Sequence, residues 1–110
     1  MGVVTDSGPA VIRLSGEHDI STRDELRLAF QASRENPRVI VDLIGVDYLD
    51  STAIGEIARA VEHTSHVPDG RVVIVARNQR LVRLLSIAGL TASVPIVDTE
   101  RDAVALLQSG

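Results

Sequence analysis

The side chains best suited to chemistry are a carboxylate and two hydroxyls in a row, at Asp50, Ser51 and Thr52. They follow an apolar, strand-like stretch and precede a segment whose apolar residues have helical spacing, namely Ile54, Ile57, Ala58 and Val61. Such residues commonly cap a helix, because its first backbone N–H groups have no partner within the helix. The same donors and their partial positive charge would also hold a phosphate. Taken alone, the three residues favour the cap over a phosphoacceptor.

A phosphate on Ser51 would act mainly through its charge. Phosphorylation adds about −2 charge at neutral pH, and Asp50 already places a carboxylate beside the serine. The patch would change from neutral to repulsive and strongly hydrated, and the fold would not need to change. A modification of this kind suits a switch on a protein-binding surface.

Ser51 could instead be a nucleophile, since His18 and Asp19 supply the other residue types of a catalytic triad. However, the Gly-x-Ser-x-Gly elbow is absent, because the serine stands in Leu49-Asp50-Ser51-Thr52-Ala53. His18 also adjoins Asp19 in the chain, and adjacent side chains rarely arrange themselves as a base and its orienting acid. We therefore predict that the chain is not an enzyme.

The sequence gives little support for a metal ion or a cofactor. The chain has no cysteine, and all of its basic side chains apart from histidine are arginines. Thiolate ligands, a phosphate-loop lysine and Schiff-base chemistry are thereby excluded. His63 and His66, near Glu62 and Asp69, could form a weak metal site, but a solvated helix end explains them better. We predict no metal and no cofactor.

The composition argues against nucleic-acid and membrane partners. The formal net charge is −4 and aromatic residues make up only 2% of the chain, so neither a basic patch nor a base-stacking platform is evident. Arg77, Arg80 and Arg83 recur every third residue, most simply as the solvated face of a helix. No apolar run approaches the roughly 20 residues that cross a bilayer, and the first residues lack signal-peptide features. We expect a cytoplasmic protein.

Alternating strand and helix patterns predict an α/β fold. Apolar strand-like segments cover residues 10–14, 39–43, 72–75 and 95–97, and a helical pattern follows each of them. Segment 39–43 shows little alternation, as expected of a strand that is covered on both faces. We predict a single domain over residues 1–110, with a mostly parallel mixed sheet of about four to five strands and about four helices.

Two glycines are expected to adopt a positive φ. Gly89 follows the third helical pattern, and a left-handed residue ends many helices. Gly70 closes the turn Val67-Pro68-Asp69-Gly70, in which proline fixes one dihedral angle and glycine would accept a positive one.

Four segments resemble, in order and spacing, the STAS-domain anti-anti-sigma factors, also called anti-sigma factor antagonists. Residues 48–55 are similar to the phosphorylation motif of this family, in which an aromatic and an apolar residue precede Asp-Ser. Gly16-Glu17-His18-Asp19 resembles a Gly-Glu-(apolar)-Asp element of the family. Residues 39–43 resemble the strand before the motif, and residues 83–90 resemble a helix end. The resemblance runs from about Ala10 to Leu107, and it implies a STAS-like fold.

The resemblance also implies a role for each matching residue. Ser51 would be phosphorylated by an anti-sigma factor that has an ATP-binding serine-kinase fold. Asp19 would lie beside the serine and contact that kinase, with Asp50 and Thr52 as flanking partner-binding residues. Unphosphorylated protein would bind the anti-sigma factor and so release a sigma factor. Phosphorylation would break the complex, and a serine phosphatase would restore it. A lone domain of this family would usually be a monomer.

Partner contact is expected to use an exposed apolar surface near Ile20, Leu49 and Ile54. One departure from the family bears on this surface, because Ala53 stands where the family usually has glycine and places a methyl group where a partner would approach. The alternative that the sequence leaves open is a non-switching STAS adaptor or scaffold in a stress-sensing or lipid-transport complex. Phosphorylation of Ser51 would distinguish the switching antagonist from the non-switching adaptor.

Overall fold

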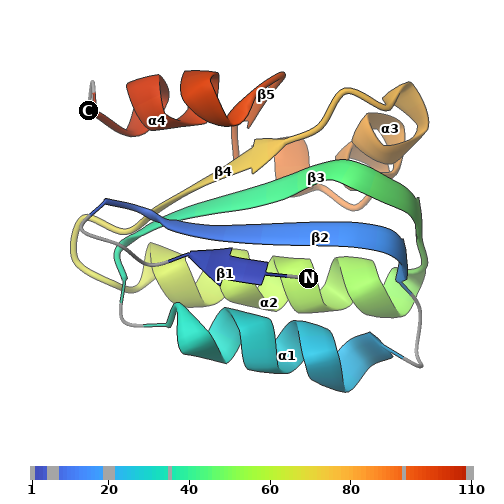
Figure 1. Cartoon of the computed structure of the whole chain (residues 1–110), viewed down its shortest axis with the longest axis horizontal. Helices are drawn as coiled ribbons and strands as arrows, with labels where there is room; N and C mark the ends of the chain where they lie inside the picture. The colour runs from blue at the N-terminus through green and yellow to red at the C-terminus, as the bar shows by residue number, and fades with distance from the viewer. Residues whose placement is uncertain (1, 5–7, 19–21, 35, 93, 109–110) are drawn as a thin grey trace.

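A five-stranded sheet forms the middle layer of the molecule (Figure 1). The computed structural model describes residues 2–4, 8–18, 22–34, 36–92 and 94–108. The strands lie side by side in chain order, with β1 antiparallel to β2 and all the other pairs parallel. Their bounds are Gly2–Val4 for β1, Ala10–His18 for β2, Arg38–Leu49 for β3, Arg71–Val75 for β4 and Ile96–Val97 for β5. The predicted mostly parallel mixed sheet is confirmed, although β1 was not foreseen.

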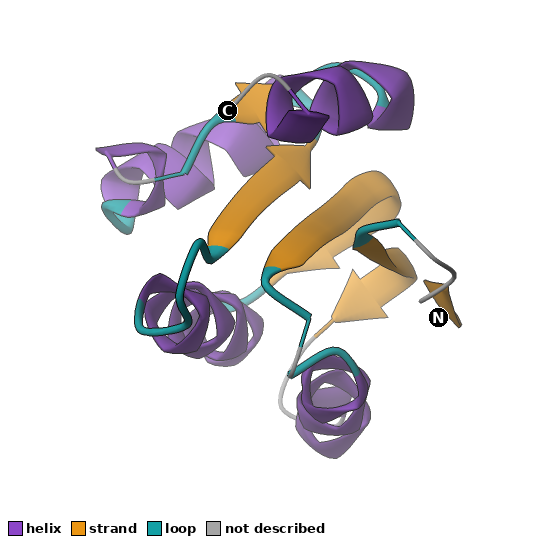
Figure 2. Cartoon of the chain, turned by 90° about the vertical axis from the view of Figure 1, so that its left-hand side faces the viewer, coloured by secondary structure: helices purple, strands orange, loops and turns teal. Residues whose placement is uncertain are grey.

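Helices cover both faces of this sheet (Figure 2). Three of them connect successive parallel strands and pack in one core, while the last packs on the opposite face. Their bounds are Arg23–Ala32 for α1, Ser51–Ser65 for α2, Gln79–Ile87 for α3 and Glu100–Gln108 for α4, with a short 3-10 helix η2 at Leu90–Ala92. Crossover connections between parallel strands are right-handed, and these strands follow one another across the sheet in chain order. The connecting helices must therefore all lie on the same face of the sheet. Only a helix after the last strand is free to cover the other side.

Side chains that alternate along β3 enter two different cores. Val39 and Val41 pack in the larger core with Leu26 of α1, whereas Ile40 packs in the smaller core with Ala103 of α4. Successive side chains of a strand point to opposite faces, so a strand between two helical layers must be apolar at consecutive positions. The prediction that this strand is covered on both faces is confirmed.

The second half of β3 bends because it contains more residues than the part of β2 with which it pairs. Arg13 pairs with Asp42, but Ser15 pairs with Gly45, so β3 carries one additional residue, and a second shift follows after Gly16. Asp42 Oδ1 accepts a hydrogen bond of 2.9 Å from the backbone N–H of Ile44 at this irregularity. Bulges of this kind bend a strand, and Figure 1 shows β3 curving toward the end that leads into α2.

The two glycines expected at positive φ behave differently. Gly89 has a φ of 83° at the end of α3, as predicted. The prediction for Gly70 is wrong, because the residue with positive φ in that turn is Asp69, at 60°. Glycine is required at position 70 for another reason, since a Cβ there would lie 1.9 Å from the carbonyl oxygen of Thr64. The turn therefore needs glycine for close packing.

Candidate functional site

Ser51 is the first residue of α2 and is exposed. The preceding residue, Asp50, caps the helix, because its Oδ1 accepts a hydrogen bond of 2.9 Å from the backbone N–H of Ala53. The Asp50 carbonyl oxygen also accepts from the N–H of Ile54 at 3.0 Å. The capping function that the sequence allowed for the Asp-Ser-Thr segment therefore belongs to Asp50. Ser51 is not needed for it.

Open hydrogen-bonding capacity remains around Ser51. Among the described residues, the serine hydroxyl has no hydrogen-bond partner. The backbone N–H groups of Ser51 and Thr52 belong to the first turn, where no carbonyl precedes them in the helix. An oxyanion attached to the serine oxygen would meet these donors at the positive end of the α2 dipole. The site can thus carry a phosphate without unfolding the helix.

The end of β2 lies beside the start of α2. His18, the last residue of β2, pairs with Leu49, the last residue of β3. Because the two strands are parallel, their carboxyl ends lie at the same edge of the sheet. The predicted contact residues Asp19 and Ile20 follow His18 directly and lie outside the described residues. Their roles stay predictions.

The expectation that Leu49 belongs to an exposed apolar surface is wrong. Its side chain is 2% exposed and packs in the larger core. The sequence pattern ended the strand at Leu43, whereas β3 continues to Leu49 and so directs this side chain inward. Ile54, also expected on that surface, is partly buried and packs against the same core. The exposed apolar surface here comes instead from Tyr48, which is 50% exposed.

Tyr48 was not among the residues predicted to bind a partner. The signal that could have found it is the alternation of side chains along a strand, since the residue before Leu49 must point to the opposite face of the sheet. Ile44, also on β3, is another large exposed apolar residue, at 40%. An exposed tyrosine two residues from Asp50 provides the kind of amphipathic side chain that is enriched in protein interfaces.

Ala53 does not place its methyl group on the surface. Its side chain is fully buried in the larger core, so the expected effect of this departure on partner approach is wrong. Thr52 is half-buried beside it. The surface at the start of α2 is therefore formed by Ser51, with Asp50 and Thr52 partly exposed on either side.

A buried carboxylate joins α1 and α2. Glu56 is only 5% exposed, and its Oε1 accepts hydrogen bonds from Arg27 at 2.9 Å and from Arg59 at 3.1 Å. The Arg27 hydrogen bond is the main cause that holds the pKa of Glu56 below its ordinary value. The sequence analysis missed this residue. Its position three residues after the buried Ala53 is the signal that could have revealed an inward-facing charge.

A second ion pair lies on the sheet face that α4 covers. Glu100 binds Arg13 through two hydrogen bonds of 2.7 Å, which lower the pKa of the carboxyl to about 2. The pKa of nearby Asp42 is raised, first because the group is buried and then because it lies beside Glu100. Since this face is opposite to α2, the pair stabilises the packing of α4 and does not belong to the Ser51 site.

The histidines considered as metal ligands make other contacts. His66 Nδ1 lies 2.9 Å from the carbonyl oxygen of Glu62, while His63 lines a pocket between α1 and α2. Within the described ranges, no three histidine, cysteine or acidic side chains are grouped so that they could hold a metal ion. No helix in those ranges is long and apolar enough to span a membrane.

The chain is similar in sequence and in fold to known proteins. The STAS domain profile matches residues 2–103. An anti-sigma F factor antagonist from Paenibacillus polymyxa is 28% identical over 104 residues, covering 92% of this chain and 88% of that protein. The crystal structure of an anti-sigma factor antagonist from Mycobacterium paratuberculosis superposes with a TM-score of 0.85 and 27% identity, covering 96% and 91%. The Bacillus cell fate determinant SpoIIAA in its phosphorylated form, at a TM-score of 0.75 and 17% identity, covering 96% and 97%, shares the fold.

Proposed function

The chain belongs to the STAS domain family, and we propose that it acts as an anti-sigma factor antagonist whose binding is switched off by phosphorylation of Ser51. The similar proteins from Paenibacillus and Mycobacterium are named anti-sigma factor antagonists, which supports the first part of this proposal. Such proteins are regulators that act by binding, so this proposal includes no catalysis by the chain. The partners would be an anti-sigma factor with a serine-kinase fold and a serine phosphatase, acting on a cytoplasmic monomer.

One observation carries the proposal. Ser51 is exposed at the first position of α2 while Asp50 alone performs the capping that a serine at a helix start normally provides. A kinase can reach the hydroxyl without breaking a described hydrogen bond. The Bacillus protein with this fold was solved in a phosphorylated form, so a phosphorylated state is compatible with the fold.

The physical effect of the phosphate would be local. It would add about −2 charge beside the Asp50 carboxylate, at the exposed start of α2. A hydrated dianion at the centre of an interface opposes binding, because its desolvation is not repaid unless the partner supplies matching cations. The interface would therefore form only with unmodified serine. Asp19 and Ile20 complete the proposed contact surface, while Thr52 and Ile54 support it.

The test compares Ser51→Ala, Ser51→Asp and wild-type protein as bait in affinity capture from the native host, without added ATP. Ser86→Asp is the matched control, since Ser86 is exposed on α3 and the same charge is introduced there. We expect wild type, Ser51→Ala and Ser86→Asp to retain an anti-sigma factor and Ser51→Asp to lose it. Mass spectrometry of the endogenous protein should find phosphate on Ser51.

Two results would contradict the switch. If Ser51→Asp captured the anti-sigma factor as well as wild type, charge at this position would not control binding. If all variants instead captured the same transport or scaffold subunits, the chain would be the non-switching adaptor that the family also contains. Circular dichroism of each variant separates loss of binding from loss of folding.

A further inference from the structure

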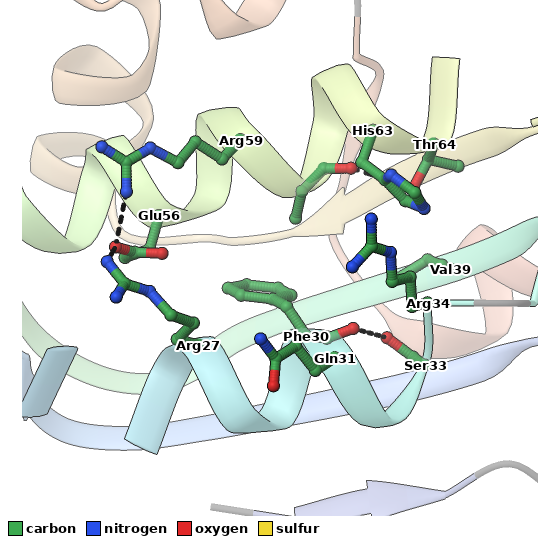
Figure 3. Close-up of a pocket in the computed structure, with 11 residues that line it drawn as sticks. Arg27, Phe30, Gln31, Ser33, Arg34, Val39, Glu56, Arg59, His63 and Thr64 are labelled. Atoms are coloured by element: carbon green, nitrogen blue, oxygen red, sulfur yellow. Dashed lines mark hydrogen bonds and ion pairs between the residues drawn. The ribbon is translucent and has the colours of Figure 1, made fainter. Parts of the chain in front are cut away.

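A pocket of about 260 Å³ lies between α1 and α2, outside the Ser51 site. Figure 3 shows the Phe30 side chain in the middle of it, with charged groups to either side. Val39 of β3 and Ala60 of α2 supply further apolar lining. The combination of an aromatic wall and several charged side chains is typical of a site for a small organic ligand.

The charge of the lining is opposite to that of the chain as a whole. The lining contains three arginines, Arg27, Arg34 and Arg59, and one carboxylate, Glu56, so the pocket carries two net positive charges if His63 is counted as neutral. The whole chain has a formal net charge of −4. A local excess of arginines in an acidic protein attracts anions, and the guanidinium fork matches carboxylate and phosphate groups.

The two ends of the pocket differ. At one end Glu56 pairs with both Arg27 and Arg59 through its Oε1, which leaves one net positive charge there. At the other end lie Arg34, in the turn that follows α1, and His63, which is seven residues, or about 10 Å of helix, after Glu56 along α2. Among the described residues, no carboxylate pairs with Arg34. Of the three arginines in the lining, Arg34 is therefore the one whose guanidinium is open to pair with an anion.

Two hydroxyl groups of the lining are already engaged. The Ser33 hydroxyl donates to the Phe30 carbonyl oxygen at 3.1 Å, and the Thr64 hydroxyl donates to the Ala60 carbonyl oxygen at 2.9 Å. An anion that binds at Arg34 would leave both of these hydrogen bonds intact. The volume is just below the range of about 300–1,000 Å³ for drug-sized pockets, so the ligand must be small.

We propose that this pocket binds a small aromatic anion, with its carboxylate or phosphate group on Arg34 and His63 and its ring against Phe30. The Glu56 ion pairs engage Arg27 and Arg59 and reduce the positive charge at the other end. Ring-to-ring contact with Phe30 adds to the burial of the apolar part. The proposal does not depend on the phosphorylation of Ser51.

The test is a titration of ¹⁵N-labelled wild-type protein with benzoate and, separately, with phenyl phosphate, followed by NMR. Benzyl alcohol supplies the same ring without charge. We expect saturable shifts of backbone amides within residues 30–34 and 60–64. Arg34→Gln should weaken binding of the better anion by about tenfold or more, because a charge-assisted bidentate contact is lost. Arg83→Gln, an exposed arginine on α3, should bind like wild type.

The relative affinities of the three ligands decide whether the site exists and which anionic group it prefers. Tighter binding of benzoate identifies a carboxylate site, and tighter binding of phenyl phosphate identifies a phosphate-ester site. The proposal is overturned if neither anion gives saturable shifts in these two segments, if benzyl alcohol binds as tightly as the anions, or if Arg34→Gln retains wild-type affinity. Amide spectra of the free variants establish that they are folded.

Discussion

Replacing Glu56 by glutamine tests whether the ion pairs of this buried carboxylate hold α1 against α2. Glutamine has the same shape and still accepts hydrogen bonds, so the change removes charge and leaves the packing in place. Glu56 is 5% exposed and contacts Arg27, which is 29 positions away in the sequence, at 2.9 Å. Arg59, on the same helix as Glu56, is 71% exposed.

The expected loss is about 1 kcal/mol of unfolding free energy. A hydrogen bond that involves a charged group is worth about 1.5–3 kcal/mol. With glutamine only the guanidinium is charged, so the bond to Arg27 falls from the upper toward the lower part of this range, a loss of about 1 kcal/mol. The bond to Arg59 adds little, because exposed ion pairs are worth about 0–1 kcal/mol. The two arginines keep access to water after the substitution, so the larger penalty for a stranded buried charge does not apply.

The assay is urea unfolding of wild type and Glu56→Gln at pH 7 and at a series of lower pH values. Glu62→Gln is the matched control, since Glu62 is an exposed residue of the same helix. The folded-state pKa of Glu56 is below its ordinary value of 4.5. Its charge therefore stabilises the fold above about pH 4.5, and this stabilisation is lost as the pH falls through the folded pKa. The difference in unfolding free energy between wild type and Glu56→Gln should therefore disappear below the folded-state pKa of Glu56.

The reasoning is refuted if Glu56→Gln is as stable as wild type at pH 7, or if it loses no more than Glu62→Gln. A difference that persists at acid pH would also refute it, because an effect of charge must vanish once the wild-type carboxyl is protonated. In that case the substitution would be acting through packing.

Three further predictions follow from other contacts. Glu100→Gln should lose stability relative to wild type above about pH 4.5 and match it as the pH approaches 2, because the Arg13 contact lowers the Glu100 pKa to about 2; a constant difference across urea titrations would contradict this. Asp50→Ala should cost about 1 kcal/mol by loss of the α2 cap, and unchanged thermal unfolding would contradict that role. Leu49→Ala should lower the unfolding free energy by about 2–5 kcal/mol because it truncates a core side chain, whereas Tyr48→Ala should change it by about 0.5 kcal/mol or less. Equal losses of unfolding free energy in denaturant titrations would contradict the assignment of Leu49 as buried and Tyr48 as exposed.

Much of the fold could be predicted from local patterns. The succession of strands and helices follows from apolar residues at spacings of two or of three and four, which each segment displays by itself. The apolar run at residues 39–43 predicted a strand covered on both faces, and Val39 and Ile40 do enter different cores. The start of a helix at Ser51 could also be predicted, because helix capping depends on residues that are adjacent in the chain.

Other features depend on segments that are distant in the sequence. The inward side chain of Leu49 required knowledge that β3 extends past two bulges, and bulges arise from pairing with β2. Strand β1 and the true bounds of β3 likewise depend on pairing partners. The dihedral angle of Gly70 was predicted incorrectly because its contact with Thr64 is a matter of packing.

The sequence by itself therefore determined the class of fold and the serine at the start of α2, because hydrophobic period and helix capping act over a few residues. Only the tertiary structure decided which side chains are exposed beside that serine. It also decided that Glu56 meets Arg27 and that Arg34 and His63 line one pocket. These contacts join α1 to α2, and the packing of two helices against one sheet is fixed by the whole core and not by either segment alone.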